Sequence, residues 1–186
     1  MRLFVGMNPP AEACTDAAEA LDRQVGQPAP GMRWVPQERW HVTLAFLGEV
    51  DSDRIPRLIE GLQSVAADHA PLTALTLADA GTFRGSLWLG VHPTERHSPA
   101  DHLARGVQRA MRAAGIAVER RPWRAHLTIA RWRSSPELDR RGHDLAEGLD
   151  YAGPTFDIDA IRLVHSVTGP NPTYSDLAVV ALRARG

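Results

Sequence analysis

The chain has 186 residues, of which 44% are hydrophobic and 23% charged, with a net charge of −1. This composition is ordinary for a globular protein with a proper core. No apolar run approaches the roughly 18 residues that span a bilayer, and the N-terminus has no signal-peptide pattern. We therefore expect a cytoplasmic protein without a membrane association. The single cysteine, Cys14, excludes an internal disulfide and a cysteine-based zinc site.

All 21 basic residues are arginine, and the chain contains no lysine. A lysyl Schiff base, a P-loop lysine and the lysyl-nucleotide intermediate of ATP-dependent nucleic-acid ligases are therefore excluded. The near-neutral net charge gives no electrostatic argument for nucleic-acid binding by the chain as a whole.

Hydrophobic periodicity and turn residues predict the elements of the first half of the chain. In chain order they are a strand over Arg2–Met7, a helix carrying Cys14 to Val25 and ending at Gly26, strands over Met32–Val35 and Trp40–Leu47, and a helix carrying Ile55 to Val65 that Pro71 ends. The segment from Gln27 to Gly31 is rich in proline and glycine and is predicted as a loop.

The second half is predicted to be richer in strands. Its elements are strands over Leu72–Ala80 and Ser86–His92 around a turn at Gly81–Gly85, a helix from Ser98 to Gly115, a strand over Trp123–Trp132, a loop or weak helix over Ser134–Gly153, and strands over Phe156–His165 and Tyr174–Leu182 separated by a Gly169–Pro172 turn. Few connections alternate regularly between strand and helix. We therefore predict an α+β fold in which antiparallel sheets carry helices on their outer faces.

One short pattern occurs twice, as RWHVTLA over Arg39–Ala45 and as RAHLTIA over Arg124–Ala130. The second histidine follows the first by 85 positions. Polar and apolar residues alternate after each histidine, which is typical of a strand with one buried face. On such a strand His41 and Thr43 point to one side, as do His126 and Thr128. A symmetric fold would therefore bring two imidazoles and two hydroxyl groups face to face.

Two imidazoles around one phosphate diester are suited to acid–base hydrolysis. An unperturbed pKa of about 6.5 lets one imidazole be neutral and the other protonated near neutral pH. The threonine hydroxyls would donate hydrogen bonds to the non-bridging oxygens. A strained cyclic phosphate is the natural substrate for this apparatus. No cluster of Asp or Glu surrounds either histidine in the sequence, so we expect neither a metal ion nor a cofactor.

The two motifs resemble the paired H-x-T-x signatures of the 2H phosphoesterases. Within that superfamily the chain is similar to the RNA 2′,3′-cyclic phosphodiesterases, also called 2′-5′ RNA ligases. The likeness covers nearly the whole chain, and it includes the segments Arg2–Val5, Met32–Val35, Leu87–Gly90 and Arg121–Pro122. It departs from the family pattern at Ala125, where many relatives have proline.

The resemblance implies a single bilobal domain over residues 1–186. Two pseudo-symmetric lobes, each an antiparallel sheet with outer helices, would flank an active-site cleft. It also implies that His41 donates a proton and His126 accepts one. The product would be an RNA end with a 2′-phosphate, and reversal with a 5′-hydroxyl in place of water would be ATP-independent 2′-5′ ligation.

Arg131 and Phe46 follow their histidines by five residues. The resemblance implies that Arg131 contacts the phosphate or the base and that Phe46 offers a stacking surface. An odd offset points to the opposite face of an ideal strand, so both roles require a twist, a bulge or a strand end. Core packing is the alternative for Phe46.

The segment Arg120–Arg133 interleaves five arginines with Trp123 and Trp132. This composition is typical of single-stranded RNA binding, in which arginine pairs with phosphate and aromatic rings stack on bases. A solvated arginine-rich edge is the alternative interpretation.

The leading functional hypothesis is hydrolysis of a terminal 2′,3′-cyclic phosphate on RNA, with tRNA fragments among the candidate substrates. Two alternatives remain. One keeps the chemistry and takes a small cyclic nucleotide or an ADP-ribose cyclic phosphate as substrate. The other is an RNA-binding module without catalysis. In each case we expect a monomer with no obligatory protein partner.

Overall fold

The computed structural model describes residues 1–167, 169 and 172–183. Its strands are β1 (Arg2–Met7), β2 (Met32–Trp34), β3 (Val42–Glu49), β4 (Leu72–Phe83), β5 (Ser86–His92), β6 (His126–Trp132), β7 (Ala152–Ile158), β8 (Ala160–Val167) and β9 (Thr173–Ala181). Its α-helices are α1 (Ala11–Gln24), α2 (Ile55–Ala67), α3 (Pro99–Ala113) and α4 (Pro136–Gly148). The predicted α+β class is confirmed.

The strands of the described residues form one antiparallel sheet in the order β7-β4-β5-β6-β3-β1-β8-β9, with β2 paired to β6. The order has two halves, β7-β4-β5-β6 and β3-β1-β8-β9, which meet where Val42 of β3 pairs with Leu127 of β6. Both residues are fully buried. The two predicted sheets are therefore the halves of one sheet, joined at the centres of the two repeated motifs.

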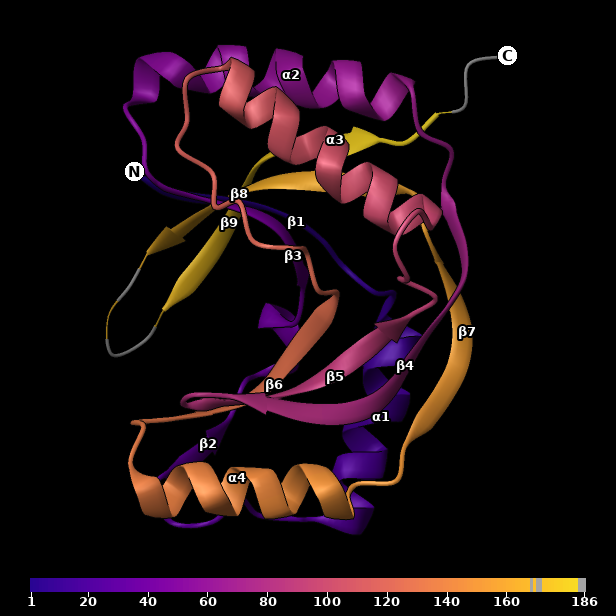
Figure 1. Cartoon of the computed structure of the whole chain (residues 1–186), viewed down its shortest axis with the longest axis vertical. Helices are drawn as coiled ribbons and strands as arrows, with labels where there is room; N and C mark the ends of the chain where they lie inside the picture. Colours follow the sequence, from indigo (N-terminus) through magenta and orange to yellow (C-terminus); the bar gives the residue numbers. More distant parts are fainter. Residues whose placement is uncertain (168, 170–171, 184–186) are drawn as a thin grey trace.

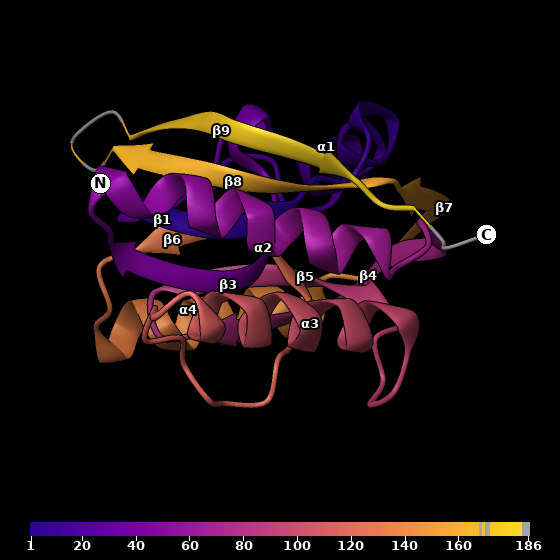
Figure 2. The same cartoon turned by 90° about the horizontal axis from the view of Figure 1, so that it is seen from above.

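The helices are divided between the two halves of the sheet (Figure 1). Helices α2 and α3 lie at one end with β1, β3, β8 and β9, and α1 and α4 lie at the other end with β2, β4, β5 and β6. Figure 2 shows α2 and α3 side by side across their end of the molecule. Helices α1, α2 and α3 each bury an apolar stripe, as in α2, where Leu58, Leu62 and Val65 are buried at helical spacing. The two motif strands thus lie in the middle of the molecule, between two helical layers.

Several boundaries differ from the predictions. The stretch Ser134–Gly153 contains the regular helix α4, which Ser135 caps by accepting the amide of Leu138 at 3.2 Å and which has proline at its first position. Its polar residues face solvent, so the apolar periodicity is weak. The predicted strand over Phe156–His165 is two strands, because the chain leaves the ladder at Asp159. The expected Gly81–Gly85 turn is shorter, since β4 continues to Phe83. Part of the predicted Gly169–Pro172 turn lies outside the described residues.

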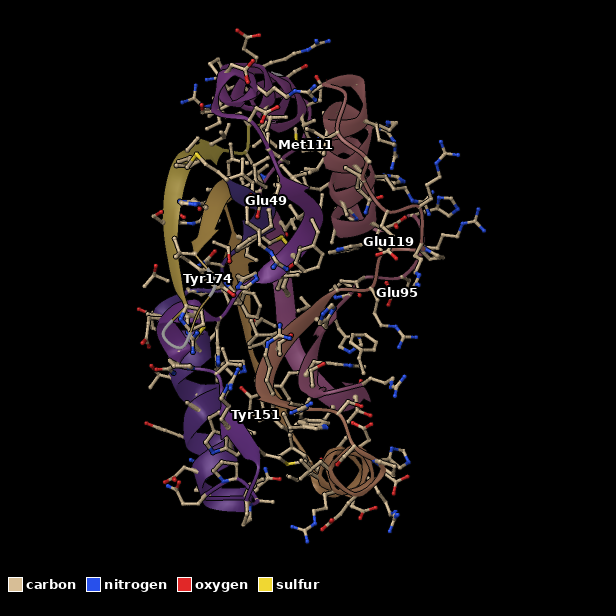
Figure 3. All side chains as sticks on the ribbon, turned by 90° about the vertical axis from the view of Figure 1, so that its left-hand side faces the viewer. Glu49, Glu95, Met111, Glu119, Tyr151 and Tyr174 are labelled. Atoms are coloured by element: carbon tan, nitrogen blue, oxygen red, sulfur yellow. The ribbon has the colours of Figure 1, made fainter. Side chains whose placement is uncertain are left out.

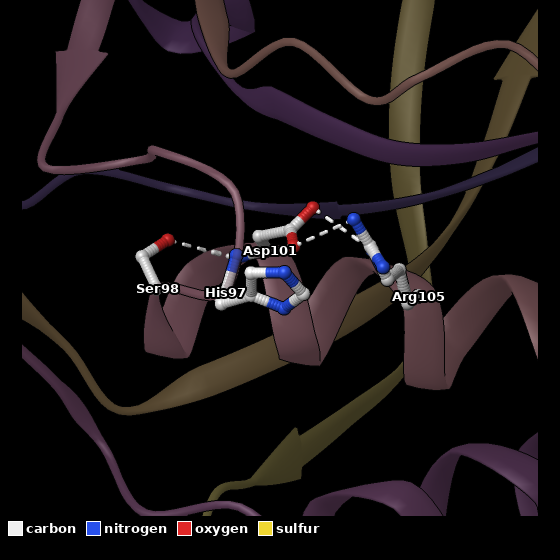
Figure 4. A network of polar contacts seen from close by, with 4 residues as sticks. All are labelled: His97, Ser98, Asp101 and Arg105. Atoms are coloured by element: carbon white, nitrogen blue, oxygen red, sulfur yellow. Dashed lines mark hydrogen bonds and ion pairs between the residues drawn. The ribbon is translucent and has the colours of Figure 1, made fainter.

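The N-terminus of α3 is held by a compact polar network (Figure 4). The Oγ atom of Ser98 accepts the amide of Asp101 at 3.2 Å. The carboxylate of Asp101 accepts the amide of His97 at 2.9 Å and the Nε atom of Arg105 at 3.1 Å. Asp101 is only 5% exposed, so these bonds replace most of the contacts that its carboxylate would otherwise make with water. The helix predicted to begin at Ser98 is thus capped by that residue.

Candidate active site

The pairing of Val42 with Leu127 sets the positions of the motif side chains. When this antiparallel register is continued by one residue in each direction, His41 lies opposite Thr128 and Thr43 lies opposite His126. All four are half-buried, and they share the sheet face opposite to the buried Val42 and Leu127. The structure therefore brings both motifs to one junction, with the two imidazoles at diagonal corners.

Each imidazole is oriented by the same backbone contact. The Nδ1 atom of His41 lies 2.8 Å from the carbonyl oxygen of Arg39, and Nδ1 of His126 lies 2.8 Å from the carbonyl oxygen of Arg124. Because a carbonyl oxygen can only accept, Nδ1 carries the proton in both rings. In each neutral ring Nε2 is then the free base, and in each protonated ring it is a free acid.

Aromatic side chains hold both imidazoles from the sides. The ring of His41 stacks on Phe4 at a centroid distance of 4.5 Å and meets Tyr174 edge-on at 5.3 Å. The ring of His126 meets Phe83 edge-on at 5.1 Å and Trp88 at 6.1 Å. These contacts restrict rotation of both rings and remove water from their faces. The sequence pattern gave no sign of these four partners, because each comes from a strand outside the motifs.

The electrostatic surroundings lower the pKa of both imidazoles below the ordinary 6.5. Burial is the largest cause for His41 and for His126, because it disfavours the charged form. The Arg131 guanidinium lowers both values further, and the charge of His126 also lowers the pKa of His41, whereas the carbonyl hydrogen bonds oppose the shift. Both surroundings therefore favour the neutral imidazole.

A bulge at the same motif position in both strands places Phe46 and Arg131 on the cleft side. In β3 the pairing passes from Thr43 with Gly6 to Ala45 with Val5, which leaves Leu44 as the extra residue. In β6 the pairing passes from Thr128 with Trp88 to Ala130 with Leu87, which leaves Ile129 extra. Each bulge reverses the side-chain alternation beyond it. Phe46 is consequently 61% exposed, so core packing is excluded for this residue.

A cleft of about 1040 Å³ opens on this face and contains most of the predicted site. Its lining includes Thr43, Phe46, His126, Thr128 and Arg131. His41 instead borders a smaller neighbouring cavity of about 180 Å³. The two imidazoles thus border different cavities, and they come from different halves of the sheet.

Only part of the predicted RNA-contacting segment lines the cleft. Trp132 is buried and donates its indole N–H to Asp139 at 2.7 Å, so the prediction that it stacks on RNA is wrong. Trp123 lines the cleft and donates to the carbonyl oxygen of Thr43 at 2.8 Å. Arg121 and Arg124 also line the cleft. The burial of Trp132 was not readable from the sequence, because its phase in the strand depends on the bulge at Ile129.

No group of three or more His, Cys, Asp or Glu side chains within the described ranges is arranged to hold a metal ion. None of the helices in that part of the chain has both the length and the apolar content of a membrane span.

Comparison with known proteins identifies the family. The family model described as the 2′-5′ RNA ligase superfamily matches residues 9–170. An RNA 2′,3′-cyclic phosphodiesterase of Geobacillus stearothermophilus is 31% identical over 177 residues, which cover 90% of this chain and 54% of the relative. The chain thus spans about half the length of that relative. A Thermotoga maritima protein of the same name is 27% identical over 95% of this chain and 93% of its own.

Solved structures show the same fold. E. coli LigT complexed with 3′-AMP superposes with a TM-score of 0.76 at 23% identity and covers 97% of both chains. TT0787 of Thermus thermophilus superposes with a TM-score of 0.74 at 24% identity over all of both chains. The matched family model, together with the paired motifs at the sheet junction, shows that this chain belongs to the 2′-5′ RNA ligase superfamily of 2H phosphoesterases.

Proposed function

We propose that this protein is an RNA 2′,3′-cyclic phosphodiesterase that opens a terminal cyclic phosphate to a 2′-phosphomonoester. The observation that carries the proposal is the register of Val42 with Leu127, which gathers two H-x-T motifs on one face of the sheet. The relatives named RNA 2′,3′-cyclic phosphodiesterase support the choice of reaction and substrate.

The hydrolysis needs one base and one acid on opposite sides of phosphorus. Nε2 of neutral His126 takes a proton from water as the water oxygen bonds to phosphorus. The bond from phosphorus to the 3′ oxygen breaks, and Nε2 of protonated His41 donates a proton to that leaving oxygen. Solvent then restores both protonation states. Each proton transfer is typically worth on the order of 10²–10⁴ in rate.

The orientation of the rings leaves both imidazoles able to transfer a proton. Both Nδ1 atoms are engaged by carbonyl oxygens, so both Nε2 atoms are available for transfer. The reaction requires one imidazole to be charged while the other is neutral. The assignment of His41 as donor and His126 as acceptor follows the family pattern.

The remaining groups stabilise charge on the phosphate. The hydroxyls of Thr43 and Thr128 lie beside the opposite histidines and donate to the non-bridging oxygens as charge builds in the transition state. The guanidinium of Arg131 adds a positive charge within range of both imidazoles. Phe46 provides an exposed aromatic surface for the terminal base. Reversal with a 5′-hydroxyl in place of water yields a 2′-5′ linkage without ATP.

The decisive experiment uses an oligoribonucleotide with a 2′,3′-cyclic phosphate end. Incubation with the protein should give a product whose phosphate is attached to the 2′ oxygen, identified by ³¹P NMR or by resistance to a 3′-specific phosphatase. A 3′-phosphate product would overturn the assigned direction of opening. An unchanged substrate, with bound RNA detectable by titration, would instead favour the non-catalytic RNA-binding module.

A further inference from the structure

Beyond His126 the cleft continues along β5 to a second histidine, which is paired with a carboxylate. The Nε2 atom of His92 lies 3.1 Å from Oδ2 of Asp79. Both side chains line the same cleft as His126, and they are 47% and 79% exposed. The pair therefore faces open space in the cleft and has no role in packing the core.

A bulge in β4 directs Asp79 toward this position. Ala78 pairs with Gly90 and Ala80 pairs with Leu89, so Asp79 is the extra residue between them. Its φ angle of 54° lies in the left-handed region, which aspartate tolerates better than most residues. The bulge frees Asp79 from the regular alternation of the strand, and its carboxylate reaches His92.

Gly90 provides the space that His92 occupies. It pairs with His126 across the β5–β6 ladder. A Cβ atom at Gly90 would lie 2.9 Å from Nε2 of His92 and 2.9 Å from the carbonyl oxygen of Ala78. The imidazole of His92 therefore lies over Gly90, directly beside the strand position of His126. The second pair is thus contiguous with the catalytic junction.

The hydrogen-bonding capacity of the pair is defined by its geometry. Nε2 of His92 faces the Asp79 carboxylate at 3.1 Å, and Nδ1 on the other side of the ring is available to a ligand. The carboxylate oxygens of Asp79 keep further acceptor capacity. Together the two side chains offer an imidazole nitrogen and a carboxylate to a ligand in the cleft.

The charges around the pair disfavour a phosphate at this place. Glu95 and Glu119 line the same cleft, and Figure 3 shows them on one side of the molecule. The nearby Arg121 is paired with Glu119 at 2.9 Å. Arg124 lies over the Trp88 ring at 5.9 Å. Carboxylates of this kind accept from hydroxyl and amino groups, which a nucleoside carries on its sugar and base.

We propose that His92 and Asp79 form a subsite for the nucleoside that precedes the nucleotide carrying the cyclic phosphate. The proposal rests on the proposed function. The volume of the cleft, about 1040 Å³, reaches the upper end of the roughly 300–1,000 Å³ typical of small-ligand sites, so the cleft has room beyond one terminal nucleotide. The subsite makes the protein selective for oligonucleotides over mononucleotides.

The test compares kcat/KM on a ribodinucleotide with a 2′,3′-cyclic end and on a nucleoside 2′,3′-cyclic phosphate. We expect the wild-type protein to prefer the dinucleotide, and His92→Asn and Asp79→Asn each to lower the ratio of the two values about five- to tenfold. Asparagine tolerates the left-handed backbone of residue 79, so the second variant keeps the bulge. Binding of the dinucleotide product, measured by calorimetry, should weaken by the same factor.

His143→Asn is the matched control, because His143 forms a similar exposed pair with Glu147 on α4, at 3.3 Å. It should leave the ratio unchanged. An unchanged ratio and unchanged product binding in both the His92 and the Asp79 variants would overturn the subsite while the proposed function stands. A wild-type protein that is inactive on both substrates would overturn the proposed function and the subsite together.

Discussion

Leu44 of β3 and Ile129 of β6 occupy the same position in the two motifs, three residues after the histidine, and each is the extra residue of a β-bulge. The two bulges turn the residue five places after each histidine onto the cleft side. They give the two strands equivalent geometry but different side chains, Phe46 from one lobe and Arg131 from the other. The junction is therefore symmetric in its imidazoles and asymmetric in the groups that surround the substrate.

Removal of either imidazole should abolish most of the activity. We expect His41→Ala and His126→Ala each to lower kcat by about 10²–10⁴, because each removes one proton transfer. The double variant should be much less than additive, since the two groups act in one step. Single-turnover rates on a cyclic-phosphate oligonucleotide measure the effect, with thermal unfolding as the check on folding. Near-wild-type activity in either single variant would rule out paired catalysis.

The pH dependence should reflect the depressed pKa values of both imidazoles. Because burial and Arg131 favour the neutral rings, the proton on the acid is lost as the pH rises through a value below 6.5. We expect a bell-shaped profile of kcat/KM with its maximum below pH 6.5, since this parameter reports the free enzyme. Rates measured over about pH 4 to 9 give the profile. A maximum well above neutrality would contradict the assigned environment.

Arg131→Gln should move the same profile toward higher pH. The guanidinium lowers the pKa of His41 and of His126, so its removal raises both values. The rate at the optimum should also fall, because a positive charge next to the phosphate is lost. Arg140→Gln, an exposed change on α4, is the control and should shift nothing. A loss of rate without displacement of the profile would mean that Arg131 acts on the substrate alone.

The reaction should proceed without a metal ion. Two imidazoles carry out both proton transfers in the proposed mechanism, and the strained ring supplies part of the driving force. We expect full activity after dialysis against EDTA, measured on the cyclic-phosphate oligonucleotide. Activity that disappears on chelation and returns with added Mg²⁺ or Mn²⁺ would refute this expectation.

Phe46→Ala should weaken RNA binding without weakening the fold. The ring is 61% exposed, so its removal costs little packing. Stacking of a base on an aromatic ring is worth about 1–3 kcal/mol, which corresponds to about 5- to 150-fold in KM. Phe46→Trp should restore binding, because the indole also presents a flat surface. Val179→Ala, at a position 54% exposed on β9, is the control for loss of an exposed apolar side chain.

Asp101→Ala should destabilise the protein. It leaves the amide of His97 and the guanidinium of Arg105 without their acceptor at a buried site (Figure 4). The expected loss in the free energy of unfolding is about 1–3 kcal/mol, measured by urea titration. Asp144→Ala, an exposed change on α4, should cost far less. Equal effects of the two substitutions would show that the network does not stabilise α3.

The sequence predicted the elements with strong periodicity and the residues that repeat. The sequence was sufficient to predict helices α1, α2 and α3 and the two motif strands, because each of these elements has a clear apolar face. The order of these elements along the chain was sufficient to predict the α+β class. Helix α4 was ambiguous, because only Gly142 and Ala146 of its residues are buried and neither is strongly hydrophobic. The break at Asp159 was hidden within a continuous stretch of strand-like residues.

The pattern of His and Thr, repeated after 85 positions, by itself predicted the family, which the family model confirms, and the candidate catalytic side chains. Only the tertiary structure decided which residues face one another. The pairing of Val42 with Leu127, the bulges at Leu44 and Ile129, and the approach of His92 to Asp79 all depend on contacts between distant segments. Local sequence sets the alternation of a strand, but register and bulges are set by the partner strand, which lies far away along the chain.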